Sequence, residues 1–160
     1  MLLDIYGTIK ANPYGCIMMN GTIQAKEGEV PVVNIYGSAK LTQTCEANND
    51  GAAIYAGGYA IWNIYAGAQI FGCTGIYAKS GELNIEGANI SATGVCVAPA
   101  GDNDGFQGTG DGVVLDTHDA YAGGLVLNVS GNTSISSSNG YGIQEVITVS
   151  EDGTTHCEGI

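Results

Sequence analysis

A short phrase of alternating apolar and polar residues recurs along this chain and restricts the folds open to it. Each copy has an apolar residue, an Asn or Asp and a branched residue in that order, and a Gly follows within a few positions. The copies are Leu3-Asp4-Ile5-Tyr6-Gly7, Val33-Asn34-Ile35-Tyr36-Gly37, Trp62-Asn63-Ile64-Tyr65-Ala66-Gly67, Leu83-Asn84-Ile85-Glu86-Gly87 and Leu127-Asn128-Val129-Ser130-Gly131. A unit of this size cannot hold a core alone, so the copies predict coils that stack on one another.

Inside the phrase the side chains alternate with a period of two, which predicts strands with one buried and one outward side. The spacing between copies is irregular, which indicates a constant rung that carries loops of different length. We expect three interior columns: Ile5, Ile35, Ile64, Ile85 and Val129; Ile9, Leu41, Ile70, Ile90 and Ile135; and Ile17, Ile54, Ile76 and Ile143. The outward Asp4, Asn34, Asn63, Asn84 and Asn128 are expected to form an amide ladder.

Composition supports many short strands in a single domain over residues 1–160. Gly accounts for 26 of the 160 residues and Pro for only 3, while branched and aromatic residues are plentiful. Such a composition is typical of strands joined by tight turns. The rungs begin and end abruptly, so we expect this domain to be part of a longer surface protein.

The recurring phrase, together with Gly75-Ile76-Tyr77 and Gly142-Ile143, resembles the right-handed parallel β-helix of the pectin-lyase-like superfamily and of bacterial adhesin-like surface repeat proteins. The resemblance implies an all-β fold: a right-handed parallel β-helix, or solenoid, of about five coils with one long inserted loop near 100–112. It also implies a secreted or cell-surface protein of bacterial origin that works in cell adhesion or carbohydrate binding.

The charge balance excludes several partners. The chain has 16 acidic residues, 4 lysines and no arginine, for a net charge of −12. This charge repels phosphate, so we expect neither nucleic-acid binding nor binding to an anionic membrane, and acidic polysaccharides are disfavoured without a metal. No signal peptide or membrane span is visible, and the low content of charged residues favours an extracellular or cell-surface location.

Outward tyrosines are the candidate ligand-binding residues. Tyr6, Tyr36 and Tyr65 share one position in three coils, and Tyr55 and Tyr77 share a place on another face. A strip of exposed rings suits sugar rings or a host-surface protein. The alternative is aromatic stacking that only stabilises the sheet.

Acidic residues gather in the stretch after residue 101. Asp102, Asp104 and Asp111 are candidate Ca²⁺ ligands, although the bidentate Glu of a calcium loop is missing. A solvated loop and a catalytic pair of carboxylates are the alternatives. The combined pattern of N-x-D, D-D, G-H-G and R-x-K that marks polygalacturonase-like enzymes is absent, and the lysines lie far from the acidic stretch in sequence, so we predict no catalytic residue and no enzyme.

Four cysteines, Cys16, Cys45, Cys73 and Cys96, fall near the same corner of successive coils. Buried thiols and disulfides between coils are both compatible with this spacing. Cys157 is expected to be free.

These observations predict an extracellular structural or adhesin-like module that binds glycans or a host surface. One alternative is a carbohydrate-active enzyme of the pectin-lyase-like class, either a polysaccharide lyase or a glycoside hydrolase. A second is a phage fibre module, which would be trimeric. Stacking of copies end to end is a further possibility.

Overall fold

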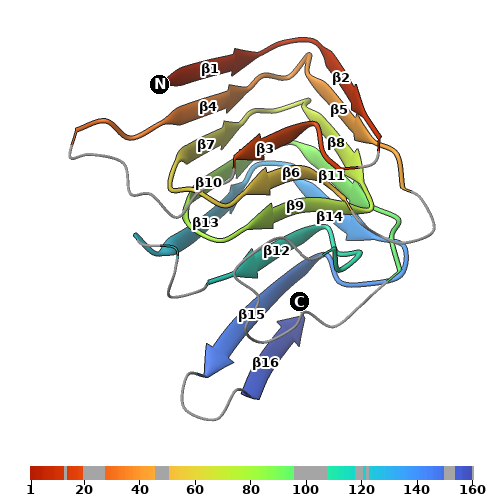
Figure 1. Ribbon diagram of the computed structural model, residues 1–160. Coiled ribbons are helices and arrows are strands. Elements are labelled where there is room, and N and C mark those ends of the chain that lie inside the picture. Colours follow the sequence, from red (N-terminus) through yellow and green to blue (C-terminus); the bar gives the residue numbers. More distant parts are fainter. Residues whose placement is uncertain are drawn as a thin grey trace.

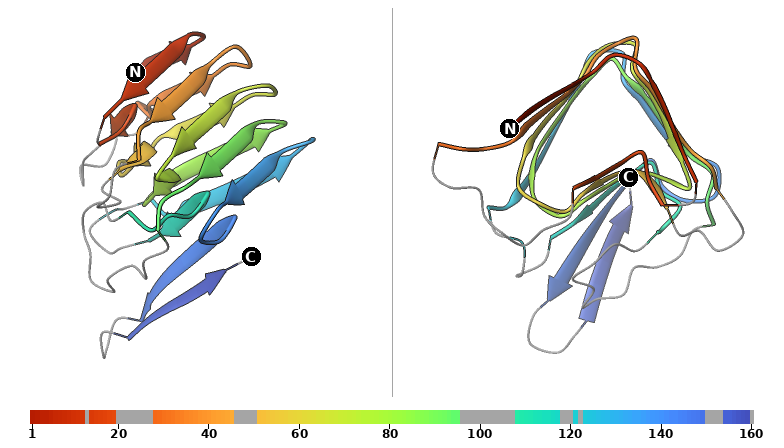
Figure 2. Two further views of the ribbon diagram at one scale, coloured as in Figure 1. Left: turned by 90° about the vertical axis from the view of Figure 1, so that its right-hand side faces the viewer. Right: turned by 45° about the horizontal axis from the view of Figure 1, so that its top comes forward.

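The computed structural model describes residues 1–12, 14–19, 28–45, 51–95, 108–117, 121, 123–149 and 154–159, with residues 147–149 and 154–159 by their backbone alone. The elements of these residues are all β-strands, which form three sheets arranged around a triangular core (Figure 1). Seen nearly along its axis, the chain traces the same triangle again and again (Figure 2). The molecule is a parallel β-helix of about five coils.

Sheet A consists of the recurring phrases. Its strands, in spatial order, are β1 (Leu2–Ile5), β4 (Val32–Ile35), β7 (Ile61–Ile64), β10 (Gly81–Glu86) and β13 (Leu125–Ser130). All neighbours are parallel, and their register aligns the phrases residue for residue, from Asp4 through Asn34, Asn63 and Asn84 to Asn128. The predicted alignment of the five copies is therefore confirmed.

Sheets B and C complete each coil. Sheet B contains β2 (Thr8–Ala11), β5 (Lys40–Gln43), β8 (Gln69–Gly72), β11 (Asn89–Ala92) and β14 (Ser134–Ser137), all parallel. Sheet C contains β3 (Ile17–Met19), β6 (Ala52–Ala56), β9 (Thr74–Ala78), β12 (Val113–Asp116) and β15 (Ile143–Val149), also parallel. The last strand, β16 (Thr154–Gly159), pairs antiparallel with β15 and forms the outer edge of sheet C.

The three predicted interior columns are present. Ile35, Ile64 and Ile85 are at most 1% exposed, and the second column pairs in the expected register throughout. In the third column Ile17, Ile54 and Ile76 also pair as expected. Burial of each such side chain stabilises the fold by about 1.5–3 kcal/mol. Val113 stands between Ile76 and Ile143 and completes the third column, which the sequence analysis had left with a gap. Val129, on the outermost strand of sheet A, is 46% exposed.

The inserted loop predicted near 100–112 falls largely on residues outside the described part of the chain. Residues 108–112 lead into β12 and are mostly buried. Thr109 and Gly110 each donate a backbone N–H to the Thr74 hydroxyl oxygen, at 3.0 Å in both cases. The end of the insertion is thus fastened to the start of β9.

Candidate functional site

Three tyrosines form a ladder at the corner where sheet A turns into sheet B. The ring centroids of Tyr6 and Tyr36 are 4.3 Å apart with an interplanar angle of 3°, and those of Tyr36 and Tyr65 are 5.0 Å apart at 16°. The shared outward position predicted for these residues is confirmed. We call this column the tyrosine ladder.

Local sequence sets the ladder. After Tyr65 the chain makes a tight turn in which the backbone N–H of Ala68 donates to the Tyr65 carbonyl at 3.1 Å. Gly67 has a φ of +91° there, a conformation that a residue with a Cβ rarely adopts. The same turn follows Tyr36, where Ala39 donates to the Tyr36 carbonyl at 2.8 Å. The corners after Tyr36 and Tyr65 have the same length, which places these two rings above one another. Tyr6 joins the column through the pairing of Ile5 with Ile35, although the corner that follows it is shorter.

Stacking changes what the ladder can offer a ligand. A ring with a neighbour on each side has both faces covered, so Tyr36 presents an edge and a hydroxyl. A hydrogen bond with the Tyr6 side chain is the main cause that raises the pKa of Tyr36 to about 12, so its hydroxyl stays protonated at neutral pH. Ring faces are therefore left only on Tyr6 and Tyr65, on the sides turned away from Tyr36.

An amide ladder lies beside the tyrosine ladder. Asn34, Asn63, Asn84 and Asn128 each donate through Nδ2 to the side-chain oxygen of the preceding coil, at 2.8, 2.9, 3.1 and 2.8 Å. The first acceptor is the carboxylate of Asp4. The predicted amide ladder is thus confirmed. An amide nitrogen carries two hydrogens and the ladder uses one of them, so Asn63, Asn84 and Asn128, which are at least partly exposed, keep a donor for a ligand.

The tyrosine ladder ends in a hollow. Glu86 follows Tyr65 in the column because Ile85 pairs with Ile64, and Ser130 comes next. A shallow hollow of about 220 Å³ opens here, and the outward side chains that line it are Asn63, Tyr65, Asn84, Glu86, Asn128 and Ser130. It combines one aromatic face, three amides, a carboxylate and a hydroxyl. We call it the ladder hollow.

Tyr55 and Tyr77 do not form an exposed pair, and this expectation was wrong. They are 2% and 0% exposed, although they lie on the outer side of sheet C as their position in the strands predicts. This side carries a second apolar cluster of Ala52, Tyr55, Tyr77, Val114 and Val146. The Tyr55 hydroxyl is 3.2 Å from the hydroxyl of Tyr121, which is itself 7% exposed.

A buried ion pair, which sequence reasoning missed, adjoins these tyrosines. Lys79 Nζ lies 2.6 Å from Asp116 Oδ2, and both side chains are almost fully buried. The Tyr77 hydroxyl donates to the same carboxylate oxygen, and the ammonium lies 5.5 Å from the Tyr77 ring centroid and 5.3 Å from that of Tyr121. The sequence signal was alternation: Lys79, directly after β9, lies two residues beyond Tyr77, and Asp116 in β12 lies two residues beyond Val114, the partner of Tyr77, so all three side chains point outward.

This cluster favours a neutral Tyr77. Burial is the main cause that raises the pKa of Tyr77, and the negative charge of Asp116 adds to it. The phenol therefore remains a hydrogen-bond donor to the carboxylate. A carboxylate that already accepts from a phenol and an ammonium is well satisfied, which suits a structural anchor on sheet C.

The candidate Ca²⁺ ligands are only partly placed. Asp102 and Asp104 lie outside the described residues. Asp111 is buried; its Oδ1 accepts the backbone N–H of Tyr141 at 2.7 Å, and its Oδ2 has no hydrogen-bond partner among the described residues. Burial raises the pKa of Asp111. No group of three His, Cys, Asp or Glu side chains suited to a metal occurs in the described part of the chain, so the Ca²⁺ site stays a prediction.

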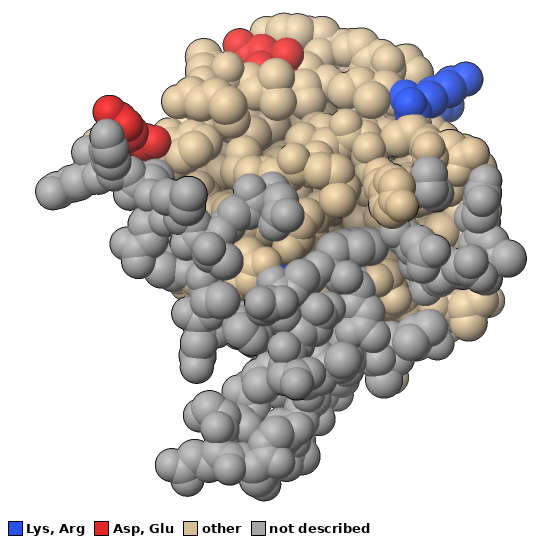
Figure 3. Space-filling model, in the orientation of Figure 1, with Lys and Arg blue, Asp and Glu red and all other residues tan. Residues whose placement is uncertain are grey.

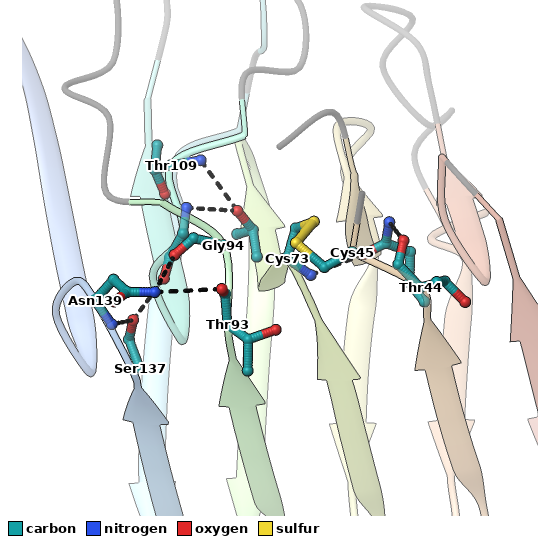
Figure 4. The surroundings of a disulfide bond; sticks show 11 residues. Thr44, Cys45, Cys73, Thr93, Gly94, Thr109, Ser137 and Asn139 are labelled. Carbon is teal, nitrogen blue, oxygen red and sulfur yellow. Dashed lines mark hydrogen bonds between the residues drawn. A yellow bond between two sulfur atoms is a disulfide. The ribbon is translucent and has the colours of Figure 1, made fainter. Parts of the chain in front are cut away.

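A disulfide joins two successive coils. Cys45 and Cys73 are bonded (Figure 4). The Cys73 backbone N–H donates to the buried Gln43 Oε1 at 2.8 Å. The cysteine spacing was compatible with buried thiols and with disulfides between coils, and Cys45 and Cys73 form such a disulfide. Cys16 is a free, half-buried thiol. Cys96 and the side chain of Cys157 lie outside the described residues.

The fold and the two side-chain ladders define the class of protein. It is an all-β parallel β-helix protein with a tyrosine ladder and an amide ladder along one edge. No family model, no curated protein and no solved structure matches this chain. The described residues include no helix long and apolar enough to cross a membrane.

Proposed function

We propose that this chain is an extracellular β-helical display module, of the adhesin-like kind, and that it attaches to glycans through the ladder hollow. The carrying observation is that Tyr65, the last ring of the tyrosine ladder, lines the ladder hollow. Tyr36 stacks on one side of this ring, and Glu86, whose side chain is exposed, takes the next place in the column. A single aromatic face at the edge of a polar hollow fits one sugar ring.

The chemistry of the hollow suits a neutral sugar. One side of a pyranose ring presents C–H groups, which pack on an aromatic face, while its hydroxyls point outward. The free amide hydrogens of Asn84 and Asn128 can donate to these hydroxyls, and the Glu86 carboxylate can accept from them. A few polar groups around an apolar contact are typical of small-molecule sites.

Two further observations support an extracellular location. The Cys45–Cys73 disulfide is of the kind that persists in oxidising compartments. The chain also has few charged residues, 12% in all, and its outward positions are rich in Asn, Ser, Thr and Tyr.

Glycan-array binding followed by calorimetry with a neutral oligosaccharide tests the proposal. We expect Tyr65→Ala to weaken binding at least about tenfold, the factor that corresponds to about 1.4 kcal/mol of lost contact. Tyr6→Ala is the matched control because it removes an equivalent ring from the other end of the ladder and leaves the hollow intact. Equal affinities of the two variants would refute the assignment of the site.

A carbohydrate-active enzyme of the pectin-lyase-like class is the second candidate. The observation in its favour is the parallel β-helix itself. A catalytic role for the group of Tyr77, Lys79 and Asp116 requires that its buried side chains become accessible to substrate. Turnover of neutral and acidic polysaccharides by the wild type, lost in Asp116→Asn with its fold intact, would favour it. In that case we propose that the chain is related to the pectin-lyase-like superfamily of right-handed β-helix proteins.

A further inference from the structure

The outer side of sheet B differs from the rest of this acidic molecule. None of its five strands contains an Asp or Glu. Two columns face outward: Thr8, Lys40, Gln69, Asn89 and Ser134 in one, and Lys10, Thr42, Phe71, Ser91 and Ser136 in the other. In a chain with 16 acidic residues, this side is locally neutral to positive.

Two of the four lysines meet on this side. Lys10 and Lys40 are exposed and lie on the paired strands β2 and β5, where Lys40 pairs with Thr8 and Lys10 with Thr42. A diagonal offset of two residues across neighbouring strands separates their Cα atoms by about 8 Å. Figure 3 shows lysine side chains together at one edge of the molecule, away from the acidic ones that it displays. Neither lysine forms an ion pair with a described residue.

Phe71 is the aromatic residue on this otherwise polar side. It is half-buried and lines a hollow of about 370 Å³ together with Lys40, Thr42, Gln69, Asn89 and Ser91. This volume lies within the range of about 300–1,000 Å³ typical of small-molecule sites. The hollow thus has an aromatic platform, amides and hydroxyls around it, and a cation at one end.

We propose that the outer side of sheet B is a second binding site, distinct from the ladder hollow, and that it takes an acidic oligosaccharide. One sugar ring packs on Phe71, its hydroxyls bond to Gln69 and Asn89, and a carboxylate or sulfate of the same or the next sugar bonds to Lys40 and Lys10. Only two cations are available, so the ligand carries isolated negative charges rather than the continuous charge of a nucleic acid or a lipid surface.

The net charge of −12 led the sequence analysis to disfavour acidic polysaccharides. Local charge decides the question at physiological salt, because exposed charges farther away than about 8 Å are largely screened. On sheet B the nearest outward side chains are the two lysines and neutral residues. The two lysines therefore attract an anionic group at this hollow, although the net charge of the whole chain predicts that it is repelled.

Calorimetric titration tests the site with three probes: an oligogalacturonate, a sulfated heparin-type oligosaccharide and a neutral cello-oligosaccharide. We expect an acidic probe to bind more tightly than the neutral one, and binding of the carboxylated or the sulfated probe identifies the acid. The Lys10→Gln and Lys40→Gln double variant should bind at least about tenfold more weakly, since a hydrogen bond to a charged group contributes about 1.5–3 kcal/mol. Phe71→Ser should also lose affinity.

The controls separate this site from the proposed function. Tyr65→Ala, which removes the platform of the ladder hollow, should leave binding of the acidic probe unchanged, and near-ultraviolet circular dichroism should show that every variant folds. Unchanged affinity in the lysine double variant would overturn the proposal, as would equal binding of the neutral probe. Loss of acidic-probe binding in Tyr65→Ala would assign that probe to the ladder hollow instead.

Discussion

The buried ion pair between Lys79 and Asp116 makes the sharpest test of how sheet C is held. Asp116→Asn keeps the size of the side chain and leaves a buried ammonium without its carboxylate. Lys79→Met keeps the length of the chain and leaves the carboxylate with the Tyr77 hydroxyl. Removal of one partner of a buried pair typically costs about 3–5 kcal/mol, because the other charge remains in a medium that solvates it poorly.

The double variant should be much less damaging than the sum of the two single ones. With both charges gone, Met fills the space of the lysine and Asn still accepts the Tyr77 hydrogen bond, so we expect a total loss of about 1–3 kcal/mol. The coupling energy between the two positions should then exceed about 3 kcal/mol. This amount is a large fraction of the about 5–15 kcal/mol that stabilises a typical domain.

Urea unfolding of the wild type, the two single variants and the double variant gives a double-mutant cycle, from which the coupling energy is calculated. Lys40→Met serves as the matched control, because the same substitution at an exposed lysine should change stability by no more than about 0.5 kcal/mol. Losses that simply add up in the double variant, or a loss below about 1 kcal/mol in Asp116→Asn, would refute the view that this pair is desolvated and mutually dependent.

Three further results are expected. Cys45→Ser with Cys73→Ser should lower the unfolding free energy by about 3.5 kcal/mol, the loop-closure value for a sequence separation of 28 residues, and a reductant should have the same effect on the wild type alone. Burial raises the pKa of Asp111, so the protonated form stabilises the fold: this contribution is complete below the unfolded pKa and disappears as the pH rises through the folded one. The stability of the wild type relative to Asp111→Asn should therefore fall from pH 3 to pH 7 in paired unfolding curves. In a spectrophotometric titration one tyrosine should ionise near pH 12, and Tyr6→Phe should lower that pKa because it removes the hydrogen bond that raises the pKa of Tyr36.

Much of the fold could be predicted from the sequence because the repeated phrase reports on one physical constraint. A branched residue two places after another must lie on the same side of a strand, and the stacked coils require this side to be the interior. Ile35 and Ile64 follow this rule and are buried. Val113 escaped detection because the insertion before it changes the spacing from the preceding coil, although its register with Ile76 is regular.

The same rule does not tell what covers the outside of a sheet. The alternation of side chains along the strands correctly predicted that Tyr55 and Tyr77 point outward. Both are nevertheless buried, in a second apolar cluster beside which the Tyr121 hydroxyl contacts that of Tyr55. The partnership of Lys79 with Asp116 was equally hidden, since 37 residues separate the two in sequence and only the register of β9 with β12 brings them together. Local alternation thus determines which side of the coil a side chain takes, while its exposure depends on segments that lie over the coil.

The polarity of the amide ladder bears on whether copies stack end to end. Every ladder amide donates toward the first coil, so the Asn128 oxygen is the acceptor that a following coil would have to meet with a donor. A second copy in head-to-tail contact would offer Asp4 there, and a carboxylate has only acceptor oxygens at neutral pH. Sheet C adds a second obstacle, because β16 runs antiparallel along the outer edge of β15 and occupies the position that a parallel strand of another copy would need. We therefore expect Asp4→Asn to be required, though not sufficient, for head-to-tail stacking of this module, and sedimentation of the wild type to show no such association.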